Sequence, residues 1–124
     1  MAASEELGIL GVDSFLYFVR EPERSRRFYE EGFGWRAVAK SSEEMIARTG
    51  QKATVYGAGD MRVAVSHPLN DSCRAARYLR RHPAGVGSMT FRVEDLDRAW
   101  RFLTDRDATP IHPIRETREG GGRY

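Results

Sequence analysis

The spacing of apolar residues changes from segment to segment, and this pattern predicts strands alternating with helices. Residues 12–19 form an apolar and aromatic run bounded by turn residues, which is typical of a strand. Pro22 suits the first turn of a following helix. One face of that helix is traced at helical spacing by Ser25, Phe28, Tyr29 and Phe33. Gly32 and Gly34 are expected to end it, because glycine accepts the left-handed conformation of a helix cap.

Three more strands are predicted after this helix. Residues 35–40 form the first, and residues 53–56 and 61–66 form a hairpin around a turn at 57–60. In the last strand two sets of side chains alternate: Met61, Val63 and Val65 against Arg62, Ala64 and Ser66. One face of this strand should therefore be buried. A helix from Ser72, as its cap, through Arg80 should follow, stopped by Pro83 and Gly85.

The chain then repeats itself without gaps at an offset of 74 residues, the separation of Gly11 from Gly85. Ser14 falls on Ser88, and residues 27–28 fall on 101–102, with Arg-Phe in both places. The second copy predicts a strand at 86–93, a helix capped by Asp95, and a strand at 109–114. The apolar stripe of its helix comprises Leu96, Ala99, Trp100 and Leu103. A period this long indicates a duplicated supersecondary module and not a solenoid.

The predicted fold class is therefore α+β, with one complete βαβββ module at about 11–70 and an incomplete one at about 85–124. Residues 1–10 are an N-terminal tail, and residues 71–84 are a connecting helix. The second module lacks its last two strands, which leaves a sheet edge open. Either the chain is a truncation or a partner supplies the missing strands.

Composition indicates an ordinary globular protein. The chain has 124 residues, of which 40% are hydrophobic and 31% charged, and its net charge is +2. Acidic and basic residues are interleaved, so no nucleic-acid surface is predicted. The single cysteine, Cys73, rules out a disulfide within one chain and fits a reducing cytoplasm. No apolar run reaches the length of a membrane span, so we expect a cytoplasmic protein without membrane contact.

A strand, a helix and three strands used twice resemble the vicinal oxygen chelate superfamily, which includes glyoxalases, bleomycin-resistance proteins and extradiol dioxygenases. Three segments narrow the resemblance to the amino-terminal portion of 4-hydroxyphenylpyruvate dioxygenases. They are residues 28–35 with Val38-Ala39, residues 60–70, and residues 79–86 with their continuation at 91–95. The similarity extends from about Gly11 to Pro113, including Ala108 and Pro110.

This resemblance implies a metal-free domain. The family converts an aromatic 2-oxoacid with O2 and Fe(II), and the iron lies in a carboxyl-terminal barrel, in a site of two histidines and one carboxylate. Metal-binding modules of the superfamily carry a histidine ligand on the first strand, where this chain has Ser14 and, in the repeat, Ser88. We therefore expect no catalytic residue and no cofactor in this chain, and Fe(II) in the complete family enzyme.

The remaining candidate residues give weaker signals. His67, His82 and His112 have no metal-ligand spacing, so a metal triad is disfavoured. Trp35 and Tyr17 are candidates for the lining of a ligand cup, with core packing as the alternative.

Three hypotheses follow. The first is an amino-terminal domain or fragment of a 4-hydroxyphenylpyruvate dioxygenase-like enzyme of aromatic amino acid catabolism. It would be inactive alone and would pack against the catalytic barrel or a second copy of the chain. The alternative is a non-enzymatic, homodimeric small-molecule binder of the bleomycin-resistance type. A glyoxalase- or epimerase-like metalloenzyme is least favoured, because Ser14 and Ser88 stand at the ligand positions.

Overall fold

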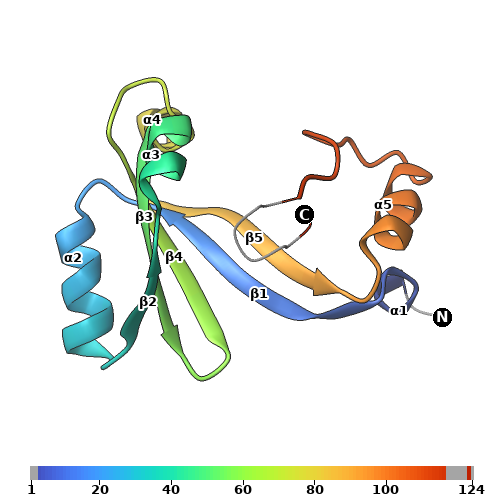
Figure 1. Ribbon diagram of the computed structural model, residues 1–124, viewed down its shortest axis with the longest axis horizontal. Coiled ribbons are helices and arrows are strands. Elements are labelled where there is room, and N and C mark those ends of the chain that lie inside the picture. The colour runs from blue at the N-terminus through green and yellow to red at the C-terminus, as the bar shows by residue number, and fades with distance from the viewer. Residues whose placement is uncertain (1–2, 117–122, 124) are drawn as a thin grey trace. The chain divides into compact units, whose positions relative to one another are not determined.

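The computed structural model describes residues 3–116 and 123, and Figure 1 shows its elements. They follow in the order α1 (Ala3–Leu7), β1 (Ile9–Phe18), α2 (Pro22–Arg26), η1 (Arg27–Gly32, a π-helical segment), β2 (Arg36–Lys40), α3 (Glu43–Thr49), β3 (Gln51–Ala58), β4 (Met61–Pro68), α4 (Arg74–Arg81), β5 (Gly85–Val93) and α5 (Leu96–Thr104). The five strands form one mixed sheet in the order β2-β3-β4-β1-β5. This arrangement confirms the predicted α+β class and the βαβββ module.

The chain divides into two compact units. One contains residues 13–90, and the other contains residues 1–12 with 91–124. Strands β1 and β5 each contribute to both units. The predicted domain boundaries follow modules and not compact units, and they stay a prediction.

Within residues 13–90 the register of the strands fixes which side chains share a face. β1 runs parallel to β4 and pairs Phe15 with Val63 and Tyr17 with Val65. β3 runs antiparallel to β4 and places Tyr56 opposite Val63. Because directly paired residues lie on the same side of a sheet, these side chains form one face. Tyr29 of the η1 segment packs against this face, so the segment after Pro22 covers it.

The opposite face is closed at one end by α4. Phe18, which is only 1% exposed, packs with Ala75, Ala76 and Leu79 of that helix. Gln51 ties the helix to the sheet: its side-chain amide donates to Ser66 Oγ at 2.9 Å, and its carbonyl oxygen accepts from the Ala75 backbone N–H at 3.0 Å.

One of the two predicted helix caps differs in the structure, and the other is confirmed. The cap of α4 is Cys73 and not Ser72, because Asn70 Oδ1 accepts the backbone N–H groups of both Ser72 and Cys73. This holds Ser72 in the loop and leaves the Cys73 sulfur to accept from Ala76 N. The predicted Asp95 cap is confirmed, with the carboxylate accepting from Arg98 N at 3.0 Å.

Helix α3 was not predicted, although its local signals are strong. Ser42 accepts from Met45 N at its start, and Gly50 has a φ of 69° at its end. A Cβ at Gly50 would lie 2.2 Å from the Asn70 side chain, so both conformation and space require glycine there.

The second copy reproduces the repeat only in part. α5 begins at Leu96, 74 residues after α2 begins at Pro22, as the repeat predicts. The strand predicted at 109–114 is wrong: residues 105–116 form turns, bends and irregular segments, with an isolated bridge from Glu116 to Arg123.

Candidate functional site

The two serines predicted at ligand positions lie half-buried on the strands β1 and β5. The Ser14 hydroxyl donates to Asp13 Oδ2 at 3.1 Å. Over residues 3–116 and 123, no group of three or more His, Cys, Asp or Glu side chains is placed to hold a metal ion. Two serine hydroxyls do not match the imidazole and carboxylate donors of a facial Fe(II) site. That these serines stand at the ligand positions depends on the resemblance and stays a prediction.

The three histidines each have their own surroundings. His67 lies on β4 opposite Lys52, and burial followed by the Lys52 charge lowers its pKa below the ordinary value of 6.5. His82 caps the end of α4 with its ring 4.9 Å from the Tyr78 ring. The His112 Nδ1 lies 2.9 Å from the carbonyl oxygen of Pro113.

The face of the sheet that the η1 segment covers carries an aromatic cluster. Tyr29 stacks on Tyr56 with ring centroids 5.1 Å apart and planes 18° apart, and it lies 5.4 Å from the Trp35 ring. Burial raises the pKa of the Tyr29 hydroxyl, and the neighbouring Tyr17 and Tyr56 raise it further. Tyr29 therefore stays protonated at neutral pH and keeps its hydroxyl as a donor.

A hollow of about 390 Å³ opens beside this cluster, and we call it the aromatic hollow. Its apolar wall consists of Tyr17, Val19, Phe28, Tyr29, Val65 and Ala84. Its polar rim consists of Arg20, Glu21, Arg24 and Ser25. Of the two predicted cup residues, Tyr17 lines this hollow, whereas Trp35 packs beside Tyr29 and Phe33 and does not line it.

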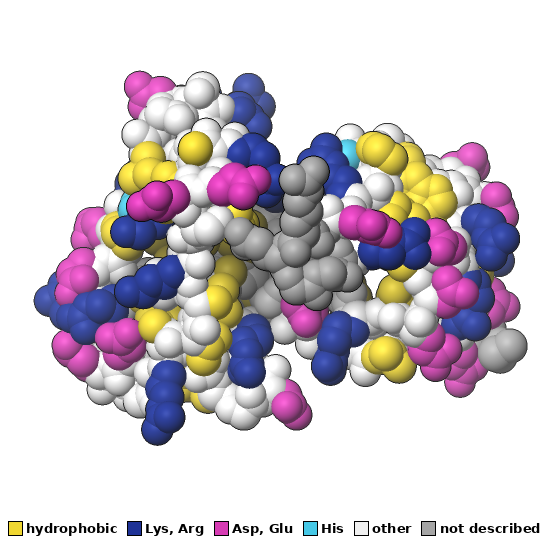
Figure 2. All heavy atoms as spheres, in the orientation of Figure 1, with side chains coloured by type: hydrophobic (Ala, Val, Ile, Leu, Met, Phe, Trp, Pro, Cys, Tyr) yellow, Lys and Arg dark blue, Asp and Glu magenta, His cyan; other side chains and the backbone are white. Residues whose placement is uncertain are grey.

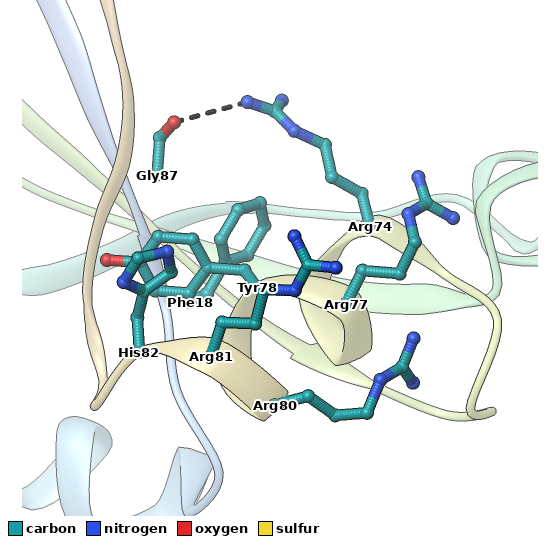
Figure 3. Close-up of a pocket in the computed structure, with 8 residues that line it drawn as sticks. All are labelled: Phe18, Arg74, Arg77, Tyr78, Arg80, Arg81, His82 and Gly87. Atoms are coloured by element: carbon teal, nitrogen blue, oxygen red, sulfur yellow. Dashed lines mark hydrogen bonds between the residues drawn. The ribbon is translucent and has the colours of Figure 1, made fainter.

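A second hollow, of about 400 Å³, lies against helix α4, and we call it the arginine hollow (Figure 3). Its lining comprises Arg74, Arg77, Arg80, Arg81, Phe18, Tyr78, His82 and Gly87. The sequence did not predict this hollow, because the chain mixes 20 basic with 18 acidic residues. Blue and magenta side chains are likewise interspersed on the face shown in Figure 2. The signal that could have found it is the spacing of the arginines, which recur every three or four residues along one short helix.

No helix among the described residues combines the length and the apolar character that crossing a membrane requires. The predicted cytoplasmic location stays a prediction.

Comparisons with known proteins agree with the fold. The family model of the Glyoxalase/Bleomycin resistance protein/Dioxygenase superfamily matches residues 11–124. No curated protein matches the chain.

Solved structures give the same picture. Methylmalonyl-CoA epimerase from Mycobacterium tuberculosis superposes with a TM-score of 0.75 at 18% identity, over 90% of this chain and 74% of that one. A selenomethionine-labelled methylmalonyl-CoA epimerase superposes with a TM-score of 0.76 at 24% identity, over 93% of this chain and 83% of that one. A hypothetical protein from Bacillus halodurans C-125 superposes with a TM-score of 0.76 at 13% identity, over 88% of this chain and 78% of that one. Identities this low establish the fold alone. The family model confirms the superfamily prediction, and the narrower dioxygenase resemblance stays a prediction.

Proposed function

The chain belongs to the Glyoxalase/Bleomycin resistance protein/Dioxygenase superfamily, and we propose that within it the chain is the metal-free amino-terminal scaffold of a 4-hydroxyphenylpyruvate dioxygenase-like protein. In this proposal the chain binds no iron. The Fe(II) chemistry on an aromatic 2-oxoacid belongs to a carboxyl-terminal barrel that packs against it.

The observation that carries the proposal is the structural role of the residues that resemble the dioxygenases. Residues 28–35 supply Tyr29 and Trp35, which fill the space between the η1 segment and the sheet. Residues 60–70 form β4, which lies between β3 and β1, and the turn in which Asn70 positions the start of α4. Side chains in these stretches pack or fix turns, which is what a scaffold requires.

The donor chemistry of the first strand supports the absence of catalysis. At the position where the resemblance places a metal ligand, the chain offers the Ser14 hydroxyl, which is already bonded to Asp13. A neutral hydroxyl is a poor ligand for Fe(II) beside imidazole and carboxylate.

Apolar surface in the unit of residues 1–12 and 91–124 supports a packing partner. Leu10 is 60% exposed, and Val12 and Phe91 are 42% and 49% exposed. These residues lie on β1 and β5, and β5 ends the sheet order. Exposed apolar side chains on neighbouring strands, one of them the terminal strand β5, favour association with another sheet or barrel.

Metal content and oxygen uptake test the proposal directly. The purified chain is loaded with Fe(II) under anaerobic conditions, freed of unbound metal, and supplied with 4-hydroxyphenylpyruvate and oxygen. We expect no stoichiometric iron and no uptake. A separately produced iron-binding barrel of a 4-hydroxyphenylpyruvate dioxygenase is then mixed with the chain, and sedimentation is expected to show a complex. Stoichiometric iron with turnover by the chain alone, or no complex with the barrel, would overturn the proposal.

The aromatic hollow favours one alternative, a metal-free small-molecule binder of the bleomycin-resistance type. Its volume of about 390 Å³ and its wall of Tyr17, Phe28 and Tyr29 suit a small aromatic compound. This function predicts a stable homodimer that binds such a compound with no barrel present. Tyr17→Ala should abolish that binding, and Trp35→Ala should serve as the control outside the hollow.

A further inference from the structure

The four arginines of the arginine hollow have no acidic partners in the described part of the chain. Arginines elsewhere do form ion pairs with carboxylates: Arg26, Arg98, Arg106 and Arg123. By contrast, Arg74, Arg77, Arg80 and Arg81 enter none of the ion pairs among the described residues. The hollow therefore holds a concentration of positive charge that a chain with a net charge of +2 does not show overall.

The spacing of these four arginines destabilises helix α4, because it places like charges side by side. Arg74 and Arg77 are three residues apart, and Arg77 is three or four residues from Arg80 and Arg81, so like charges are neighbours on one helix surface. Arg80 and Arg81 lie in the last turn, where the helix dipole favours cations. Arg74 lies at the first residue of α4, where the dipole disfavours them. Helix stability thus explains the last two arginines and does not explain Arg74 and Arg77.

Three of the guanidinium groups are held in place by backbone carbonyls. Arg74 Nη2 donates to the Gly87 oxygen at 3.2 Å, the dashed line in Figure 3, and its guanidinium lies 5.3 Å from the centre of the Phe18 ring. Arg80 Nη1 donates to the Asp71 oxygen at 2.6 Å, and Arg77 donates to the Ser72 oxygen. A guanidinium carries five N–H donors, so each group keeps donors free for an anion after these bonds form.

Aromatic rings complete the hollow. Figure 3 shows the rings of Phe18, Tyr78 and His82 gathered together while the arginine side chains fan out from α4. The Tyr78 ring lies 5.2 Å from Phe18 and 4.9 Å from His82, and its hydroxyl donates to the Val86 oxygen at 3.3 Å. Anchored rings of this kind present a surface on which a planar base can stack.

We propose that the arginine hollow binds an organic di- or triphosphate of the nucleotide class. The phosphate oxygens accept from the free donors of Arg74, Arg77 and Arg81, since guanidinium groups match phosphate in paired hydrogen bonds. The base lies against Tyr78 and His82. A volume of about 400 Å³ is that of a small-molecule site. The arginines are confined to one eight-residue helix, which favours a compact ligand over a nucleic-acid strand.

Calorimetric titration of the purified chain tests this, with ADP, pyrophosphate and adenosine as probes. We expect ADP to bind most tightly, pyrophosphate more weakly, and adenosine not measurably. Arg77→Gln and Arg81→Gln should each weaken ADP binding about two- to fivefold, the upper part of the range that one exposed ion pair supplies. Arg48→Gln is the matched control, because Arg48 is also exposed near a helix C-terminus but lies outside the hollow, and it should leave ADP affinity unchanged.

A purely structural role for the arginines makes the opposite prediction for folding. If Arg77 served the helix, Arg77→Gln would lower the melting temperature; relief of repulsion between like charges should instead leave it unchanged or raise it. Absence of ADP and pyrophosphate binding at millimolar concentration, or equal ADP affinity in Arg77→Gln and the unmodified chain, overturns the proposal. Binding of a 20-nucleotide oligothymidine without binding of ADP would also overturn the proposal, because the surface would then bind a nucleic-acid strand.

Discussion

Replacing Gly87 by alanine is expected to destabilise the protein because the added methyl group has no room. A Cβ at residue 87 would lie 2.2 and 2.4 Å from two carbon atoms of the Phe18 ring. Phe18 is 1% exposed, and Tyr78 and the α4 residues pack around it. The ring can therefore move away from an added methyl group only by displacing Tyr78 or the α4 residues, or by shifting into the arginine hollow that it lines.

The expected magnitude follows from two opposing effects. Overpacking a closed core costs about 1–3 kcal/mol, whereas alanine in a strand regains about 0.5–1 kcal/mol of the entropy that glycine loses on folding. These two effects subtract to a loss of about 0–2.5 kcal/mol, and the contacts of 2.2 and 2.4 Å with a buried ring exclude the low end. The free energy of unfolding of Gly87→Ala should therefore fall by about 1–2 kcal/mol. At about 4 °C per kcal/mol for a domain of this size, the melting temperature should drop by about 4–8 °C.

Urea unfolding followed by circular dichroism measures the change, with Gly32→Ala as the control. At Gly32 the nearest atom to an added Cβ is the Arg27 carbonyl oxygen at 3.8 Å, an ordinary contact. Its stability should stay within about 0.5 kcal/mol of the unmodified protein or rise slightly.

A double-mutant cycle with Phe18→Leu identifies the cause of the loss. If the clash with the ring is responsible, the smaller leucine side chain makes room for the methyl group, and Phe18→Leu costs at least about 1 kcal/mol less in the Gly87→Ala background than alone. Equal stability of Gly87→Ala and the unmodified protein, or strictly additive costs, would refute the packing argument.

Two further predictions concern the neighbouring elements β3 and β4. Gln51→Ala should lower the free energy of unfolding by about 2–4 kcal/mol, because it removes the partners of the buried Ser66 hydroxyl and the Ala75 N–H. Lys52 is adjacent and exposed, so Lys52→Ala is the control in the same urea titration. A loss of stability in Gln51→Ala no larger than that in Lys52→Ala would contradict this prediction. His67 has a lowered pKa in the folded state, so the unfolded chain takes up a proton first as the pH falls through about 6.5, and stability should decline below that pH. In His67→Gln the urea midpoint should change less between pH 7.5 and 5.5 than it does in the unmodified protein. An unchanged pH dependence would show that His67 is not the group responsible.

Local patterns predicted much of the element order. The apolar runs at 12–19 and 61–66 became β1 and β4, and the repeat offset placed α5 correctly because it compares one local pattern with another. Prediction failed at three places. The bonds of Asn70 Oδ1 to the backbone N–H groups of Ser72 and Cys73 leave Cys73, and not Ser72, as the cap of α4. Helix α3 was missed, and the strand predicted at 109–114 did not form.

The candidate sites divide in the same way. That Ser14 and Ser88 are poor metal ligands follows from residue type, and the sequence alone could state it. That Tyr17 lines a hollow while Trp35 packs outside it depends on how the η1 segment lies on the sheet, which no local pattern specifies. The four arginines of α4 line a hollow only because the fold brings Phe18 and Gly87, which are distant in sequence, beside them.

The sequence by itself determined most of the segments that become strands and helices, the position of α5 through the 74-residue repeat, and the kinds of donor atom along β1. These depend on side-chain periodicity, helix caps and chemical type, which act within a few residues. Only the tertiary structure decided that β1 runs parallel to β4, that Gly87 must lack a side chain, and that charges spread along α4 share one hollow. Such features depend on which distant surfaces exclude water together, and that choice is made by the packing of the whole chain.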